Sequence, residues 1–226
     1  MHIVWQDFES GGELWLGGIG ASGNLTCLLD NGITGIWPAA ANPPVISDAR
    51  LTDYGTCDGT GVMTGWDKLK EWVAVRVQRV IRDVLSGKKV LVSCRNGMHR
   101  SSTLMAIILM ALTKTSADDV YSYLRTLRNI VQLDRNHPRQ YTNPPPIPLH
   151  WLNERESELQ FLWDGSRDLL RLCSPQEMED LCKDLGLVKS AAFRAQDRRL
   201  GYGYRSARMS LETMGPLTRA LAGVHE

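Results

Sequence analysis

The hydrophobic positions change their period along the chain, from short apolar runs to long stretches with helical spacing. Short runs bounded by glycine or proline predict strands at 13–18, 33–37 and 89–93. Between the first two, residues 21–30 predict a short helix that ends at Asn31-Gly32. The chain therefore opens as a β-α-β unit.

Three further segments have the pattern of helices. Residues 64–86 repeat apolar side chains at i, i+3 and i+4 until Ser86-Gly87, which predicts an amphipathic helix. Residues 104–112 are apolar on every side, as in a helix buried through the centre of a domain. Ser116 resembles an N-cap, and an inward-facing apolar stripe follows it. Alternating strands and helices predict an α/β fold, in which a central, mostly parallel mixed sheet has helices on both faces.

The segments between and after these elements are rich in glycine and proline. Residues 39–63 predict a long surface loop with a short strand near Val45-Ile46, and loops of this length are more often functional than idle. The proline run at 143–148 ends the core or begins a last packing helix near 151–163. We therefore predict one main domain over 1–164. Residues 165–226 are predicted to form a partly flexible helical extension, with one helix from Ser174 to about Gly186.

Composition restricts the possible partners. A net charge of +1 gives no whole-protein field for nucleic acid or an anionic membrane, so any anion site is local. The N-terminus lacks the features of a signal peptide, and no apolar run approaches the roughly 20 residues of a membrane span. We expect a soluble, cytoplasmic or otherwise intracellular protein. The five cysteines and five histidines have no metal-ligand spacing, so we expect reduced thiols, no metal and no cofactor.

The segment VLVSCRNGMHRSST, residues 90–103, places Cys94 between a buried strand and the start of a buried helix. A tight loop before a helix turns several backbone N–H groups toward one point, and the helix dipole adds partial positive charge there. Gly97 permits the conformation of a small cradle, and Arg100 can hold two oxygens of a phosphate. The sequence therefore predicts an anion site that contains its own nucleophile.

The same donors stabilise the thiolate and lower the pKa of Cys94. Attack of this thiolate on a phosphate monoester gives a cysteinyl phosphate, whose oxygens Arg100 and the N–H groups neutralise. Ser101 can donate a hydrogen bond to the sulfur and help it to leave in a second step.

The leaving oxygen also needs a proton donor, for which the long loop supplies several aspartates. Asp58 is the favoured general acid, because it lies just before the helix predicted at 64–86. Asp48, Asp53 and Asp67 remain alternatives, and Asp58-Gly59 can equally be a plain turn.

The segment SCRNGMHRS resembles the C-x5-R-S/T signature of the cysteine-dependent protein tyrosine phosphatase superfamily, and its surroundings resemble the dual-specificity branch. The segments ELWLGG, LLDNGITGIWPAAAN, KKVLVSCRNGMHRSSTLMAIILM and DVYSYLRTLRNIVQL occur in that family's order, over roughly residues 12–135. The resemblance implies a mixed α/β sheet, a two-step phosphatase mechanism and no metal. Family members directed at phosphoinositides tend to carry lysines in the loop, so Arg95 and Met98 favour phosphotyrosine and phosphoserine/threonine in proteins as substrates. The resemblance makes Cys94 the nucleophile, Arg100 the phosphate clamp and Ser101 the hydroxyl that aids hydrolysis. The implied phosphate-binding residues are Cys94, Arg95, Asn96, Gly97, Met98, His99 and Arg100.

Two departures from the family pattern leave alternatives open. Ser93 stands where the family usually has His, and the 36-residue spacing between Asp58 and Cys94 is longer than usual. One alternative is therefore a pseudo-phosphatase that recognises phosphate but turns over poorly. Another is an RNA 5′-phosphatase, for which basic side chains near the end of the domain are candidate contacts, although a solvated helix face explains them equally well. These side chains are Arg125, Arg128, Arg135 and Arg139.

Overall fold

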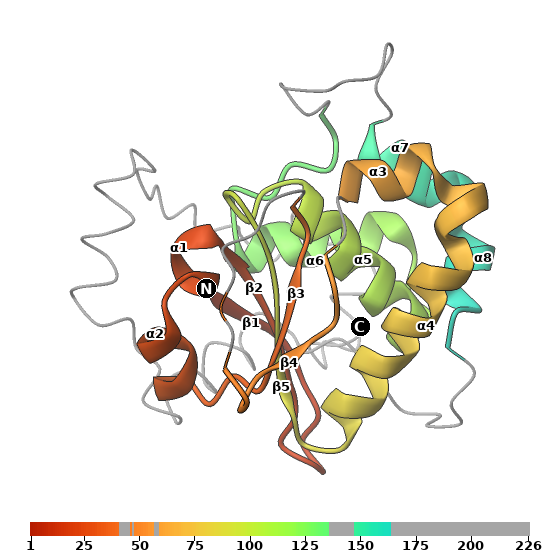
Figure 1. Cartoon of the computed structure of the whole chain (residues 1–226). Helices are drawn as coiled ribbons and strands as arrows, with labels where there is room; N and C mark the ends of the chain where they lie inside the picture. Colours follow the sequence, from red (N-terminus) through yellow and green to blue (C-terminus); the bar gives the residue numbers. More distant parts are fainter. Residues whose placement is uncertain (41–45, 47, 57–58, 136–146, 164–226) are drawn as a thin grey trace, which may run out of the picture. The chain divides into compact units, whose positions relative to one another are not determined.

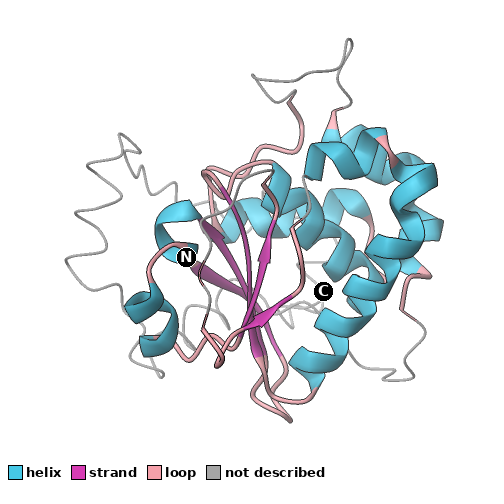
Figure 2. Cartoon of the chain, viewed as in Figure 1, coloured by secondary structure: helices cyan, strands magenta, loops and turns pink. Residues whose placement is uncertain are grey.

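The computed structural model describes residues 1–40, 46, 48–56, 59–135 and 147–163. They form an α/β fold around a mixed sheet of five strands (Figures 1 and 2). The predicted fold class is therefore confirmed for this part of the chain. The extension predicted over 165–226, with its helix from Ser174, lies outside the described residues. In chain order, the strands are β1 (His2–Gln6), β2 (Glu13–Gly18), β3 (Gly35–Pro38), β4 (Thr52–Asp53) and β5 (Lys89–Cys94).

The helices lie on both faces of the sheet, with α1 and α2 on one side and α4, α5 and α6 on the other (Figure 1). In chain order, the helices are α1 (Ile19–Ser22), α2 (Leu25–Asp30), α3 (Gly59–Thr64), α4 (Trp66–Leu85), α5 (Arg100–Thr113), α6 (Ala117–Leu127), α7 (Pro148–Glu154) and α8 (Glu156–Gln160).

Strand β5 is the centre of the sheet, whose order is β1-β2-β5-β3-β4. It pairs in parallel with β2 on one side and β3 on the other, and only its first residue is not buried. This explains its uninterrupted apolar run, Val90-Leu91-Val92, since a strand covered on both faces needs no polar side. Cys94 is its last residue and lies opposite Gly18 of β2. The carboxyl ends of three parallel strands therefore meet around Cys94.

Helix α5 begins six residues after Cys94 and is buried from Ser101 to Leu112, which confirms the burial predicted for the apolar residues 104–112. Its central position fixes the segment that precedes it, because a buried helix cannot shift without losing its packing. Helix α6 begins after Ser116, whose side chain accepts a hydrogen bond from the backbone N–H of Asp119, which confirms the predicted N-cap.

Several boundaries differ from the prediction. The helix expected over 21–30 is split into α1 and α2, because Asn24 caps the second helix by accepting from the N–H of Cys27. Ile46 lies in no strand, and the short strand of the long loop is β4 instead. Strand β1 and helix α3 were not predicted. The last packing helix is two short helices, α7 and α8.

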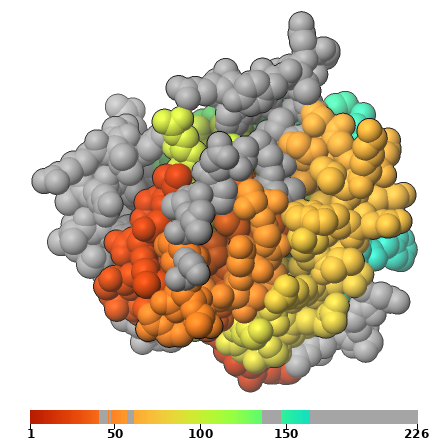
Figure 3. Space-filling model, in the orientation of Figure 1, coloured from red at the N-terminus to blue at the C-terminus, as the bar shows by residue number. Residues whose placement is uncertain are grey.

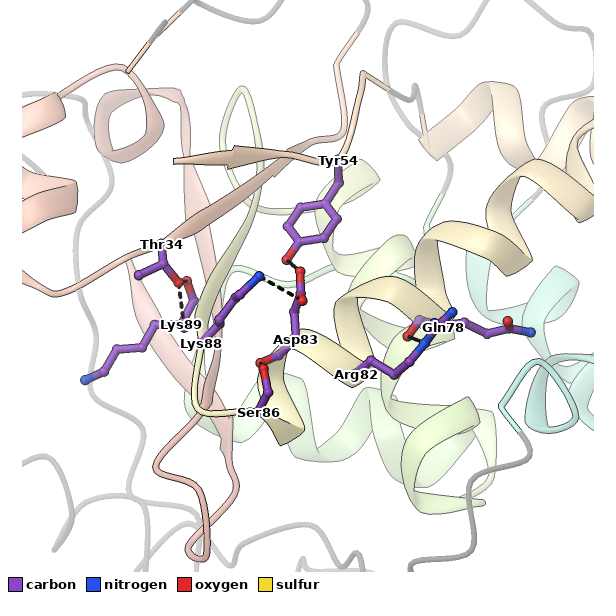
Figure 4. A network of polar contacts seen from close by, with 8 residues as sticks. All are labelled: Thr34, Tyr54, Gln78, Arg82, Asp83, Ser86, Lys88 and Lys89. Carbon is purple, nitrogen blue, oxygen red and sulfur yellow. Dashed lines mark hydrogen bonds and ion pairs between the residues drawn. The ribbon is translucent and has the colours of Figure 1, made fainter. Parts of the chain in front are cut away.

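A polar network joins β4, the end of α4 and the start of β5 (Figure 4). The Tyr54 hydroxyl donates to Asp83 Oδ2 at 2.6 Å, and Lys88 Nζ lies 2.9 Å from Asp83 Oδ1.

On the face shown in Figure 3, α4 forms a broad exposed flank beside the N-terminal residues. None of the helices in the described ranges is long and apolar enough to cross a membrane.

Candidate active site

Residues 95–99 form a short loop between β5 and α5, and Gly97 makes its tight turn possible. Gly97 has a φ of +67°, which side chains with a Cβ rarely adopt. A Cβ at this position would also lie 2.7 Å from the Gly17 carbonyl oxygen of β2. The glycine is therefore required both by the backbone conformation and by the close approach of the neighbouring strand.

The loop curls around the sulfur of Cys94. The backbone N–H of Gly97 donates to Sγ at 3.2 Å, and Ser101 Oγ donates to it at 3.1 Å. Cys94 is 6% exposed, so it is buried beneath the loop. The structure thus brings together three of the residues that the sequence placed in one site.

These hydrogen bonds act on the ionisation of the thiol. Burial by itself raises the pKa of Cys94, because it disfavours the charged form. The Ser101 hydroxyl and the backbone N–H groups of Ser101, Met98 and Asn96 outweigh burial and hold the pKa below its ordinary value. The site therefore favours a thiolate with the donors of an anion cradle around it.

The other predicted loop residues differ in exposure. Arg95 is exposed, Asn96 and Met98 are half-buried, and His99 is buried immediately before α5. Arg100 is the first residue of α5 and is half-buried. It therefore begins the helix whose N-terminus adjoins the loop.

The outer side of the loop contacts a residue whose structural role was not predicted. Arg128 follows α6 and is 8% exposed. Its Nη2 donates to the Asn96 carbonyl oxygen at 3.0 Å and its Nε to that of Gly97 at 3.1 Å. The sequence indicates Arg128 only as one of four candidate RNA contacts near the end of the domain. The structure buries it, whereas Arg125 remains exposed and contacts Tyr121.

Asp58, the favoured general acid, lies outside the described residues. Among the alternatives, Asp48 is held by Arg50 at 2.7 Å, and this hydrogen bond lowers the pKa of Asp48 to about 2. A carboxyl with such a low pKa is a poor proton donor at neutral pH. Asp53 accepts from the N–H of Gly55 at 2.8 Å, and Asp67 is exposed in the first turn of α4.

A metal centre is not evident in the part of the chain that the structure describes. Within it, no three or more His, Cys, Asp or Glu side chains are grouped to hold an ion.

Residues 67–143 match the dual specificity phosphatase catalytic domain family. Among solved structures, DUSP15 has 20% sequence identity to this chain and a TM-score of 0.52. The match covers 74% of this chain and 90% of the DUSP15 chain. Human DUSP28 also has 20% sequence identity, with a TM-score of 0.49. The match covers 65% of this chain and 93% of the DUSP28 chain. The likeness to DUSP15 concerns the fold. No curated protein matches the chain in sequence.

Proposed function

We propose that this chain, whose residues 67–143 match the dual specificity phosphatase catalytic domain family, hydrolyses phosphate monoesters through a cysteinyl-phosphate intermediate on Cys94. The observation that carries this proposal is the position of Cys94 Sγ, which accepts hydrogen bonds from Gly97 N–H and Ser101 Oγ at the end of β5. A buried thiol with a lowered pKa beside a helix N-terminus is suited to nucleophilic attack on an anionic substrate.

In the first step, the thiolate attacks phosphorus in line with the leaving oxygen. An S–P bond forms and the P–O bond to the leaving group breaks. The amide N–H groups of the loop and the guanidinium of Arg100 neutralise the equatorial oxygens, which carry the charge in the transition state. Because the donors are fixed by β5 and α5, little reorganisation is needed during the reaction.

The leaving oxygen takes up a proton, which we assign to Asp58. The assignment of Asp58 is tested by comparing substrates whose leaving groups differ in acidity. Asp58→Asn is expected to reduce turnover of phosphotyrosine far more than turnover of an aryl phosphate with a very acidic phenol, because only the poorer leaving group needs protonation. An equal loss on both substrates would move the role to Asp53 or Asp67.

In the second step, water attacks phosphorus and gives a proton to the Asp58 carboxylate, which restores the general acid, while the S–P bond breaks and the sulfur leaves as thiolate. Ser101 stabilises this thiolate through the same hydrogen bond, at 3.1 Å, that it makes in the free protein. Inorganic phosphate is the product.

We infer that the substrates are phosphotyrosine and phosphoserine/threonine in proteins. The phosphate-binding loop carries Arg95 and Met98 but no lysine, whereas family members that act on phosphoinositides tend to have lysines there. Arg95 is exposed and follows Cys94 directly, so we propose that it contacts residues that flank a phosphorylated side chain.

Hydrolysis of p-nitrophenyl phosphate tests the reaction, with Cys94→Ser as the control. Activity that disappears in this variant supports the proposal. If the wild-type protein binds vanadate but releases no p-nitrophenol, the chain is a phosphate-recognising pseudo-phosphatase instead. A panel of phosphopeptides, inositol phosphates and 5′-triphosphorylated RNA then tests the substrate class. Preferential turnover of the RNA, with salt-dependent binding, would replace phosphoproteins by RNA 5′ ends.

A further inference from the structure

Four consecutive carbonyl groups of the phosphate-binding loop accept hydrogen bonds from residues outside it. Such a complete set matters, because a loop without regular structure otherwise has few restraints on its peptide planes. The donors come from the two sides of the loop, namely the start of α1 and the segment after α6. In loop order, the bonds are Ile19 N to Arg95 O at 3.2 Å, Arg128 Nη2 to Asn96 O at 3.0 Å, Arg128 Nε to Gly97 O at 3.1 Å and Gln132 N to Met98 O at 3.1 Å.

The two carbonyls that Arg128 holds belong to the peptide groups that face the sulfur. In a planar trans peptide, the C=O of one residue and the N–H of the next point in opposite directions. The N–H partners of the Asn96 and Gly97 carbonyls are those of Gly97 and Met98. The first lies 3.2 Å from Cys94 Sγ, and the second lowers the pKa of Cys94. Arg128 and the sulfur therefore interact with opposite ends of the same two peptide groups.

We propose that Arg128 is a positioning residue, which orients and polarises these two peptide groups so that their N–H groups stabilise the Cys94 thiolate and the bound oxyanion. Hydrogen bonds that are linked through one peptide group strengthen one another. A cation that binds the carbonyl oxygen of a peptide group therefore makes the N–H of the same peptide group a better donor. The inference deepens the proposed function and rests on it only for the identity of the oxyanion as a phosphoryl group.

Three features suit an arginine to this task. Its fork of N–H groups reaches two neighbouring carbonyls at once, which a lysine Nζ cannot do in the same geometry. The backbone of Arg128 is fixed at the end of α6, where its N–H donates to the Leu124 carbonyl oxygen. A Cβ at position 97 would lie 3.1 Å from Arg128 Nη2, so the close contact also depends on Gly97.

The test measures the reactivity of Cys94 as a function of pH, which requires no substrate. Iodoacetamide modifies the thiolate, and mass spectrometry of the peptide that contains Cys94 separates it from the other cysteines. The variants are Arg128→Lys, which keeps the charge but not the fork, and Arg128→Gln, which removes both. Arg125→Gln is the matched control, because it removes an exposed guanidinium one turn earlier on α6 that bonds to Tyr121.

In both Arg128 variants we expect alkylation to be about tenfold slower than in the wild type at acidic pH, where the thiolate fraction limits the rate, and similar at alkaline pH. The vanadate concentration that protects Cys94 is expected to rise by about tenfold, since a hydrogen bond to a charged group is lost or weakened. Arg125→Gln is expected to retain the wild-type profile.

A wild-type pH profile in Arg128→Lys would overturn the inference, even if its melting temperature fell, because the effect would then concern packing alone. If Arg128→Gln fails to fold, the pH profile of Cys94 alkylation in Arg128→Lys still tests the inference. Failure of the wild-type protein to hydrolyse p-nitrophenyl phosphate would overturn the proposed function, but it would leave this alkylation test unaffected.

Discussion

Ser101 Oγ lies 3.1 Å from Cys94 Sγ and donates a hydrogen bond to it across the loop that joins β5 to α5. Both side chains are buried, so the hydroxyl cannot be replaced by bulk water without rearrangement. The contact links the last residue of the central strand to the first turn of the central helix.

Ser101→Ala is predicted to slow hydrolysis of the cysteinyl phosphate more than its formation. Because the hydroxyl helps to lower the pKa of Cys94, its removal raises the pKa of the thiol and makes it a poorer leaving group. A hydrogen bond to a charged group contributes about 1.5–3 kcal/mol, so kcat is expected to fall by about 10- to 100-fold. Rapid-quench kinetics would then detect accumulated phosphoenzyme. Ser122→Ala, on the exposed side of α6, is the control. An unchanged kcat in Ser101→Ala would contradict the assignment.

Arg100→Lys is predicted to abolish activity almost as completely as Arg100→Ala. A lysine ammonium is a point charge and cannot bind two phosphoryl oxygens in the geometry of a guanidinium. We expect kcat/KM for p-nitrophenyl phosphate to fall by at least about 100-fold in both variants. Arg82→Lys, an exposed change on α4, controls for the substitution itself. Retained activity in Arg100→Lys would rule out a bidentate clamp.

Gly97→Ala is predicted to remove activity and to destabilise the protein. The left-handed conformation alone costs an alanine about 1–2 kcal/mol, and the Cβ would meet the Gly17 carbonyl oxygen at 2.7 Å. Gly11→Ala separates the two effects, because Gly11 has a φ of +74° but nothing within 4 Å of a Cβ. Urea unfolding is expected to show a larger loss of stability for Gly97→Ala, with phosphatase activity lost only in that variant. Equal losses of stability would mean that the loop can move away from β2.

Tyr54→Phe is predicted to reduce stability in a pH-dependent manner. Burial opposes ionisation of Asp83, but the hydrogen bonds from Tyr54 and Lys88 outweigh it and lower the pKa of Asp83. The pKa of Asp83 is therefore lower in the folded protein than in the unfolded protein. Its contribution to stability is complete at a pH above the unfolded-state pKa, and it is lost as the pH falls through the folded-state pKa. The free energy of unfolding is expected to fall by about 1.5–3 kcal/mol at pH 7 and by less in acid.

The control for this prediction is Tyr123→Phe. The Tyr123 hydroxyl donates to the Val4 carbonyl oxygen at 2.7 Å, an acceptor that does not titrate. Its loss is expected to cost about 1 kcal/mol at every pH. Denaturant unfolding of both variants at pH 7 and at acid pH makes the comparison. If the loss of stability varied with pH in the same way in Tyr54→Phe and Tyr123→Phe, Asp83 would not be the source of the pH dependence.

Local pattern was sufficient for the elements that define the candidate site. The apolar run 90–92 before Cys94 and the apolar stretch 104–112 after Ser101 each specify their own structure, because burial on all sides favours an uninterrupted run of apolar residues. Pattern was insufficient for β4, whose two residues, Thr52 and Asp53, are polar and become a strand only by pairing with β3. Strand β1 is not predicted from the local pattern, although its residues pair antiparallel with β2.

The sequence by itself determined that a cysteine stands between a buried strand and a buried helix, with a glycine, an arginine and a serine at spacings that suit a phosphate-binding loop. These features depend on residues close together in the chain, whose relative positions follow from the local conformation. Only the tertiary structure decided what holds the outer side of that loop. Arg128 is 31 residues from Gly97 and binds its carbonyl oxygen, and a carbonyl is present in every residue. No pattern of side chains can indicate which backbone group a distant arginine will reach, because that depends on how α6 packs against the sheet.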